Sequence, residues 1–439
     1  MNAKEGSFGK PFLSKRFVGI AIVLCLLFLV AIPGIAAEQT MQKASASEVT
    51  TASEDDFVLG IYGNANEDDT IDMRDLTYVK LIFFGKKLET ELADAKYDGK
   101  INPLDFVQIK LIIVGKEKEL TLIDSADRIV TVKKPVERVV SMSLYCYEAI
   151  RMFGELDKIV GIEKNVNQYP TYFPEGSKFP CIGGYPPDAE AILSLEPDLV
   201  VGATSWTKHL YDKLSDSVPV VGLNFMSRTH FVEETVKFGY IMNKRDKADN
   251  YLKTFCDKYL DTIKARTGRL SEDEKPKVYV ESSFGDYKAY GGGSGAQTYI
   301  EIAGGRNIFS DSPSYSEVDP EAVMARNPDI IIKHLRKGAG YETDDPSVIV
   351  DIWQEIMNRP ELANVTAVKN GNVYIIHEGL SYGFDHPIAI AYMAKWFHPD
   401  LFTDLDPQAM HQEFIDNFCP GLDFNVYEHG IFVYPPLEE

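Results

Sequence analysis

The chain has little positive charge and few cysteines. Its 45 lysines and arginines stand against 66 aspartates and glutamates, which gives a formal net charge of −21. Nucleic acids and anionic membranes are bound by basic surfaces, so this balance argues against both as partners. Outside the first apolar run the cysteines are Cys146, Cys181, Cys256 and Cys419. A Cys146–Cys181 disulfide and four free thiols remain alternatives, because sequence alone does not determine connectivity.

The sequence is also poor in motifs of catalysis. It contains no His-Glu-x-x-His motif and no closely paired cysteines. The glycine run Gly291–Gly293 is not followed by the Lys-Ser/Thr pair of a phosphate-binding loop. We therefore expect no catalytic residues, no catalytic cofactor and no enzymatic activity.

The N-terminus has the pattern of a targeting segment. Lys10, Lys15 and Arg16 precede an apolar stretch over residues 17–32, and small residues follow up to Ala37. A cleaved export signal and an uncleaved membrane anchor over residues 1–37 are both compatible with this pattern. Either one places the rest of the chain outside the cytoplasm. Residues 38–56 have the composition of a flexible linker.

Residues 57–120 contain two similar units, each an oxygen-rich loop followed by an apolar helix and a glycine. The order of side chains along each loop is that of a calcium-binding loop, with hard oxygen ligands at alternating positions and a final carboxylate that enters the helix. The first loop offers Asn64, Asn66, Asp68, Thr70, Asp72 and Asp75. The second offers Asp94, Asp98, Lys100, Asn102 and Asp105.

This doubled loop-helix unit resembles a dockerin, and the resemblance implies a small all-α domain that binds calcium and attaches to a cohesin-like protein or to itself. Two departures weaken the match. Asp69 replaces the usual glycine at position 6 of the first loop, and Lys96 stands at position 3 of the second, where a ligand oxygen belongs. Acidic surface turns without metal are the alternative.

A second internal repeat lies in the larger part of the chain. The phrase from Asp188 to Val201 recurs from Asp319 to Ile332. In each, an aspartate can cap a short helix, a glutamate occupies its first turn, a proline ends it and an apolar run follows. Such a run is typical of a strand buried on both faces. We expect two similar α/β lobes, and a ligand cleft between them.

The expected organisation is a first lobe over residues 126–230, a helical stretch over 231–270, a second lobe over 275–403 and an extension over 404–439. The two phrases, the long helix and several shorter motifs resemble the substrate-binding proteins of ABC importers for iron-siderophores, haem and cobalamin. The shorter motifs begin at Val136, Ile182, Ala303 and Gly371. The resemblance implies two Rossmann-like lobes joined by a long helix, with a ligand between them.

The same resemblance implies partners and roles for individual residues. In this family one glutamate of each lobe docks on arginines of the membrane permease, which works with an ATPase, and Glu190 and Glu321 stand at those positions. From the residues alone, each glutamate is equally explained by the helix dipole. The implied ligand is an iron chelate, haem or a corrinoid, so it contains iron or cobalt.

Ligand contacts are expected where strands of the lobes end. The candidate ligand-binding residues are Tyr145, Tyr147, Trp206, Tyr287, Tyr290, Gly292, Tyr382 and His386. The aromatic side chains suit a large planar or chelated ligand, and a histidine such as His377 or His386 can ligate a metal centre. Each of them also has a plain role in packing. A surface scaffold or binding protein without a transport role, tethered by its dockerin-like unit, remains the alternative function.

Overall fold

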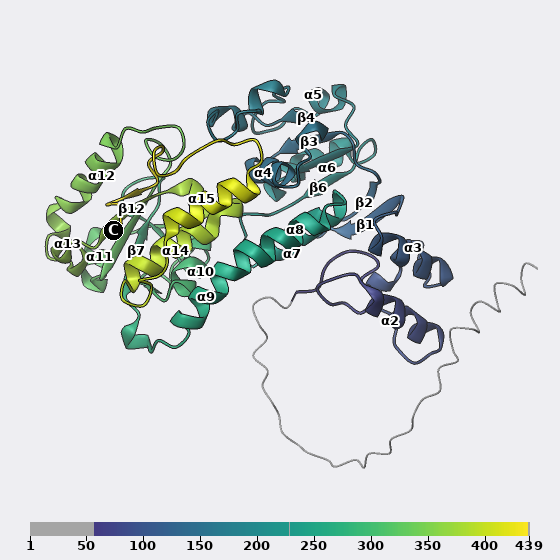
Figure 1. Cartoon of the computed structure of the whole chain (residues 1–439), viewed down its shortest axis with the longest axis horizontal. Coiled ribbons are helices and arrows are strands. Elements are labelled where there is room, and N and C mark those ends of the chain that lie inside the picture. The colour runs from purple at the N-terminus through teal and green to yellow at the C-terminus, as the bar shows by residue number, and fades with distance from the viewer. Residues whose placement is uncertain (1–56, 228, 438–439) are drawn as a thin grey trace, which may run out of the picture. The chain divides into compact units, whose positions relative to one another are not determined.

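The computed structural model describes residues 57–227 and 229–437 (Figure 1). The expected export signal or anchor and the expected linker lie outside these ranges. Within them, no helix combines the length and the apolar character needed to cross a membrane.

The repeat unit forms two helices, α2 (Met73–Phe83) and α3 (Pro103–Ile113), with a 3-10 turn at Glu91–Ala93 between them. Asp72 and Asn102 cap the helices, and the side chains of Asp75 and Asp105 complete the capping boxes. Such a box satisfies amide groups that a helix start leaves without partners. Both loops therefore lead directly into a well-capped helix.

These helices are not a separate all-helical body. Ile61 bridges to Leu122 in the antiparallel hairpin of β1 (Glu119–Ile123) and β2 (Ile129–Lys133). The hydroxyl of Tyr240, in the helical stretch that follows the first lobe, accepts a bond from the Ile71 amide (3.1 Å) and donates to the Ile71 carbonyl (3.3 Å). One hydrophobic core includes residues of the repeat unit, the hairpin and both lobes. The expectation of an all-α unit on its own is corrected accordingly.

The first lobe contains a four-stranded parallel sheet of order β4-β3-β5-β6. Its strands are β3 (Val139–Met142), β4 (Ile159–Ile162), β5 (Leu199–Gly202) and β6 (Val220–Gly222). The helices that connect them are α4 (Leu144–Met152), α5 (Ala189–Ser194) and α6 (Thr204–Leu214). All four residues of β5 are buried, as a parallel strand covered on both faces requires.

The second lobe contains a seven-stranded mixed sheet, in which β11 (Ile330–Leu335) runs parallel to β7 (Lys277–Glu281) and β12 (Val373–His377). The remaining strands are β8 (Lys288–Tyr290), β9 (Arg306–Asn307), β10 (Tyr315–Glu317) and β13 (Val433–Tyr434). Its helices are α10 (Gly295–Ile302), α11 (Pro320–Arg326), α12 (Ser347–Met357), α13 (Thr366–Asn370) and α14 (His386–Phe397). The α/β class is confirmed, although antiparallel strands make the second sheet larger than the first.

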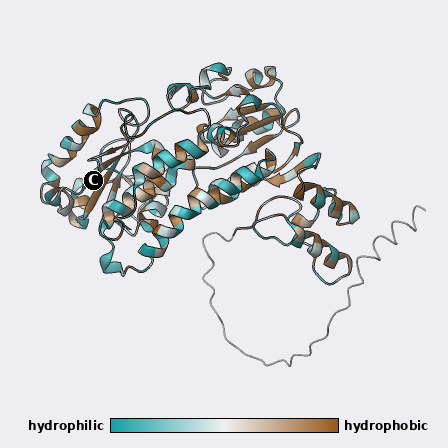
Figure 2. Cartoon of the chain, in the orientation of Figure 1, coloured by the Kyte–Doolittle hydropathy of each residue, from teal (hydrophilic) through white to brown (hydrophobic). Residues whose placement is uncertain are grey.

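A chain of helices runs from one lobe to the other (Figure 1). It consists of α7 (Phe231–Ile241), α8 (Arg245–Tyr251), a π-helical turn at Leu252–Cys256 and α9 (Asp257–Thr267). Figure 2 shows hydrophobic strands in both sheets, whereas these helices carry hydrophilic residues along one side. The two lobes are therefore joined by helix, which resists bending more than an extended strand does.

The C-terminal extension packs against both lobes and the connecting helix. Its helix α15 (Pro407–Phe418) contacts α14, and β13 adds an antiparallel strand beside β12. Phe414 and Phe418 lie against Phe255 of the connecting helix. The Sγ of Cys419 accepts a bond from Arg151 in the first lobe at 3.4 Å. The extension thus connects the second lobe to the first.

Candidate functional site

A cleft lies between the two lobes, and its space of about 860 Å³ includes the open solvent at its mouth. Its walls come from segments that follow strands β3, β7, β11 and β12, which is the usual ligand position in an open α/β fold. The lining residues of the first lobe are Leu144, Tyr145, Glu148, Tyr169, Tyr172, Phe173 and Met226. Those of the second lobe are Phe284, Tyr315, Arg336, Ala339, Tyr341, Glu342, His377, Glu378, Gly379, Tyr382 and Asp385.

The lobes touch across this cleft. The rings of Tyr172 and Tyr341 stack with centroids 4.3 Å apart. The carboxylate of Glu342 accepts bonds from the Thr171 amide (3.0 Å), the Thr171 hydroxyl (2.8 Å) and the Tyr172 amide (3.2 Å). A loop of the first lobe is therefore fastened to a loop of the second at the cleft wall.

Buried polar groups face the cleft from both lobes. Glu148 is only 7% exposed, its Oε2 has no hydrogen-bond partner among the described residues, and burial raises its pKa to about 7. Across from it, burial lowers the pKa of His377 to about 4, so this imidazole is neutral at physiological pH. Glu378 accepts a hydrogen bond from the Ser283 hydroxyl (2.8 Å) and forms an ion pair with Arg336 (3.3 Å).

Two of the predicted ligand residues, Tyr145 and Tyr382, line this cleft. Tyr290 lies directly behind the second of them, with the two hydroxyls 3.3 Å apart. Ligand contact by these tyrosines stays a prediction, since the structure contains no ligand.

The structure does not bring the other candidates to the cleft. Tyr147 is fully buried against Phe173, and Trp206, in helix α6, packs against Tyr185. Tyr287 donates to Glu361 at 2.5 Å beneath the guanidinium of Arg359. The buried His386 lies 2.9 Å from the Gly383 carbonyl through its Nδ1, and it lines a separate small cavity.

Glycine is required at Gly291 and Gly292 by backbone packing within the lobe and not by the approach of a ligand. A Cβ on Gly291 would stand 1.9 Å from the Pro313 carbonyl oxygen, and one on Gly292 would stand 2.1 Å from that of Ser310. The amide of Gly292 also donates to the Ser312 carbonyl (3.0 Å). These glycines allow the chain before β10 to lie against their backbone.

Sequence reasoning missed most of the charged residues of the cleft. Glu148, Arg336, Glu342 and Glu378 come from four separate segments. Glu378 carried a signal, since it directly follows a buried strand. Gly379–Gly383 also spells the Gly-x-Ser-x-Gly pattern of a nucleophile elbow. Here, however, Ser381 is fully buried within a 3-10 turn, so it is not presented to the cleft.

The two glutamates expected to dock on a permease have matching surroundings. Glu190 lies in the first turn of α5 and Glu321 in the first turn of α11, each behind an aspartate whose side chain caps the helix. Both glutamate side chains are exposed to solvent. The structure thus leaves two free carboxylates, one on each lobe.

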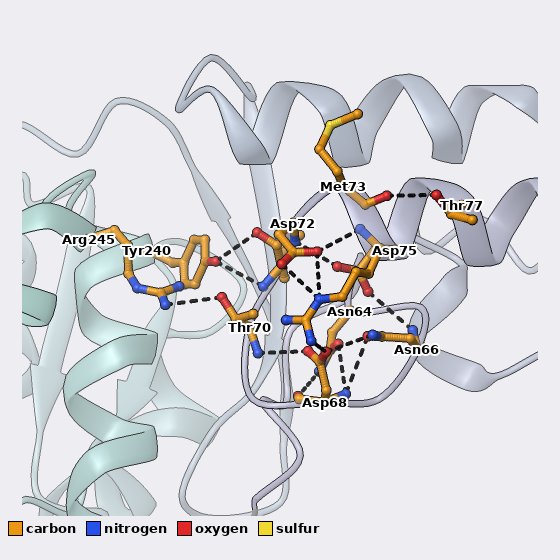
Figure 3. Close-up of polar contacts among 12 residues, drawn as sticks. Asn64, Asn66, Asp68, Thr70, Asp72, Met73, Asp75, Thr77, Tyr240 and Arg245 are labelled. Carbon is orange, nitrogen blue, oxygen red and sulfur yellow. Dashed lines mark hydrogen bonds and ion pairs between the residues drawn. The ribbon is translucent and has the colours of Figure 1, made fainter.

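The oxygen-rich loops are held mainly by their own hydrogen bonds (Figure 3). In the first, Asp75 accepts from the amides of Asn66 (3.2 Å) and Asp72 (2.7 Å). The guanidinium of Arg74 lies 3.0 Å from Asp68 and 2.9 Å from Asp72. Over residues 57–227 and 229–437, no three His, Cys, Asp or Glu side chains are grouped to hold a metal ion.

The second loop has the same backbone pattern. Asp105 accepts from the amides of Lys96 (2.9 Å) and Asn102 (2.8 Å), and Asp94 accepts from the amides of Asp98 (3.1 Å) and Gly99 (2.7 Å).

All four cysteines of the described chain are free thiols, with Cys146 buried and Cys181 exposed. The disulfide alternative is therefore not formed in this structure.

Two α/β lobes, a helical connection and a cleft lined from both sides define a two-lobed binding protein. A family profile described as periplasmic binding protein matches residues 139–380, and the chain belongs to this family. The match spans more than half of the chain and includes the cleft loops of both lobes.

The curated relatives are distant in sequence, and each match covers about half of this chain or somewhat more. An uncharacterised ABC transporter substrate-binding lipoprotein, YvrC of Bacillus subtilis, is 24% identical over 64% of this chain and 86% of its own length. The Fe(3+)-citrate-binding protein YfmC of the same organism is 24% identical over 56% of this chain and 74% of its own. A vitamin B12-binding protein of Vibrio parahaemolyticus is 23% identical over 46% and 72%.

Solved structures share the fold. The TroA-like periplasmic binding protein FepB of Veillonella parvula superposes with a TM-score of 0.60 at 22% identity, over 71% of this chain and 98% of its own. The molybdate-binding protein MolA of Haemophilus influenzae gives a TM-score of 0.55 at 20% identity, over 68% and 97%. At these identities the likeness establishes the fold and leaves the ligand open.

Proposed function

We propose that this protein is the extracytoplasmic substrate-binding component of an ABC importer, which captures an iron chelate, haem or a corrinoid and delivers it to the membrane permease. The observation that carries the proposal is the aromatic cleft between the two lobes of a periplasmic binding protein. Relatives named for ferric citrate and vitamin B12 support a metal complex as cargo. The basic and apolar N-terminal segment supports export, with or without a retained anchor.

A direct binding measurement tests this function. The purified protein is titrated calorimetrically with ferric siderophores, ferric citrate, haemin and corrinoids, and material that copurifies with it is identified by mass spectrometry. We expect at least one of these complexes to bind with micromolar or tighter affinity. Failure of all of them would remove the importer function.

The docking role of Glu190 and Glu321 belongs to the same proposal. Two exposed carboxylates on separate lobes provide paired sites for arginines, which bind carboxylates through two parallel hydrogen bonds. A permease that contacts both lobes at once would sense how they are placed around the ligand.

We further propose that the repeat unit attaches the protein to a partner, as a dockerin does to a cohesin-like protein, and that its loops bind calcium. Apolar side chains on both helices support attachment, because Met73, Phe84, Leu104, Val107 and Val114 are all exposed. Patches of this kind mark interaction surfaces. A tethered surface protein without a transport role is the corresponding alternative function.

In the first loop calcium would compete with Arg74, whose guanidinium now holds Asp68 and Asp72. The residues that would hold the ion are the predicted oxygen donors from Asn64 to Asp75. We expect calcium to raise the thermal midpoint of the full chain, and Arg74→Ala to bind calcium more tightly than the wild type. Asp68→Asn is the matched loss-of-charge control. An unchanged midpoint in both wild type and Arg74→Ala would remove the calcium proposal.

A further inference from the structure

The lining of the cleft contains more negative than positive side chains. Four carboxylates line it, Glu148 from the first lobe and Glu342, Glu378 and Asp385 from the second. Arg336 is the cationic side chain of the same lining. A neutral His377 adds no positive charge, because burial holds its pKa at about 4. The chemistry of the lining therefore differs from that of a pocket built to hold anions.

The single guanidinium of the lining is already engaged. Arg336 Nε lies 3.3 Å from Glu378 Oε2, and the guanidinium carbon lies 5.3 Å from the centre of the Phe284 ring. An anionic ligand would have to compete with a carboxylate for it. When Glu378 and Arg336 are set aside as a neutral pair, Glu342 and Asp385 are left, together with Glu148, which is only partly ionised at neutral pH because burial raises its pKa to about 7.

Another arginine, Arg151, lies behind the wall, where its charge offsets part of that of Glu148 on the same helix. Its guanidinium stacks on Tyr172 at 4.4 Å, donates to the Tyr172 carbonyl at 2.5 Å and bonds the Sγ of Cys419. It is 3% exposed and is not part of the lining. Tyr172 stands between this charge and the cleft.

Glu148 is the buried carboxyl group of the lining. It is more than nine-tenths buried, its Oε2 makes no bond of ordinary hydrogen-bond geometry within the described residues, and the Tyr172 hydroxyl and the Phe384 amide lie near enough to lower its pKa. A group of the ligand that donates to this oxygen would complete its hydrogen bonding. Tyrosine rings around the cleft add to the same preference, since their faces attract cations.

From this lining we infer that the cleft selects a metal complex of positive or zero net charge with amide or amine donors at its rim, and that it disfavours polyanionic chelates. The inference rests on the proposed function and narrows its ligand class. Among the complexes considered, corrinoids with an amide periphery meet it, whereas ferric citrate does not.

Two corrinoids with the same ring and different axial ligands provide the test. Diaquocobinamide is a cation and dicyanocobinamide is its neutral counterpart, and ferric citrate is the anionic comparison. In calorimetric titrations of the full chain we expect the cation to bind about fivefold or more tightly than the neutral form, the scale of one solvent-accessible ion pair. Its affinity should fall as salt is added, while that of the neutral form changes little.

Variants of the lining show whether its charge causes the preference for the cationic corrinoid. They distinguish this cause from direct coordination of cobalt by a side chain of the protein. Arg336→Gln should strengthen binding of the cation, and Glu378→Gln should weaken it, each by about threefold to tenfold. Glu301→Gln, which removes an exposed carboxylate of α10 that does not line the cleft, should leave all affinities unchanged. Unchanged binding of the cation in both lining variants would overturn the inference.

The possible outcomes distinguish a failure of the charge preference from a failure of the proposed importer function. If ferric citrate binds more tightly than diaquocobinamide and Arg336→Gln weakens it, the charge preference is wrong and the importer function stands. If none of the three complexes nor any siderophore or haemin binds, the proposed function fails, and the inference fails with it.

Discussion

At the scale of single residues, the cleft depends on which aromatic side chains reach it. Tyr145 and Tyr382 do, whereas Trp206 packs into its own lobe beside Tyr185. All three come from segments that follow strands of the sheets. Position along the chain therefore identifies the right end of each sheet without identifying the side chains that face the ligand.

Tyr382→Ala should weaken binding of the complex that binds the wild type, by about tenfold. The reason is the loss of a large aromatic contact, which is worth about 1–2 kcal/mol at a binding site. Trp206→Ala is the matched control, and its affinity should equal that of the wild type. Calorimetric titration measures both, and a loss confined to the tryptophan variant would contradict the placement of the site in this cleft.

The buried imidazole of His411 should make the protein sensitive to acid. Its Nε2 lies 2.6 Å from the Tyr341 hydroxyl, and burial lowers its pKa to about 3. A folded-state pKa below the unfolded value means that this contribution is complete above the unfolded pKa and is lost as pH falls toward the folded one. His411→Gln does not titrate in this range.

We expect the unfolding free energy of the wild type to exceed that of His411→Gln at about pH 7, and the gap to narrow by about 2 kcal/mol at about pH 4.5. Urea unfolding at the two pH values measures the gap. Other buried groups titrate in both proteins and cancel in the difference. A gap that stays constant with pH would show that His411 is not held neutral by the fold.

At the scale of elements, the two copies of the repeated phrase form the same structure. Asp188 and Asp319 each cap a short helix, and the apolar runs become the buried strands β5 and β11. Capping and burial depend on neighbours within a few residues, so they could be predicted from the sequence. The antiparallel strands β8, β10 and β13 could not, because their pairing joins distant segments.

The contact of Gly291–Gly293 with the chain before β10 is another long-range feature that could not be predicted from the sequence. Gly292→Ala should destabilise the fold by about 1–3 kcal/mol, because its Cβ would lie 2.1 Å from a backbone oxygen. Gly60→Ala, whose nearest atom would be a side-chain carbon at 3.3 Å, is the milder control. Urea unfolding compares them. Stability equal to the wild type would mean that the chain before β10 moves aside at no cost.

At the scale of the whole molecule, the helical connection and the C-terminal extension hold the lobes together. The π-helical turn at Leu252–Cys256 lies inside the connection, and Phe255 of this turn packs on Phe414 and Phe418 of α15. Arg151 and Cys419 join the extension to the first lobe. Because these contacts hold the lobes together, we expect the lobes to move only slightly relative to each other when a ligand binds.

The double variant Glu190→Arg, Glu321→Arg should abolish uptake in cells and leave ligand affinity unchanged. Reversed charges would repel the arginines of the permease, while both residues lie outside the cleft. Uptake of a radiolabelled ligand and calorimetry of the purified variant measure the two effects. Glu301→Arg, on α10, is the charge-reversal control. Normal uptake by the double variant would refute the docking role.

The sequence by itself determined the local features of this protein: the capped helices, the buried strands, the loop-helix repeat and the presence of two α/β lobes. These depend on periodicity and on contacts within a few residues. The tertiary structure alone decided which side chains share the cleft. Arg336 and Glu378 meet because β11 and β12 lie side by side in the second lobe, and Glu148 joins them only because the first lobe faces the second across the cleft. The charge of the cleft, and with it the preferred ligand, therefore depends on the tertiary structure.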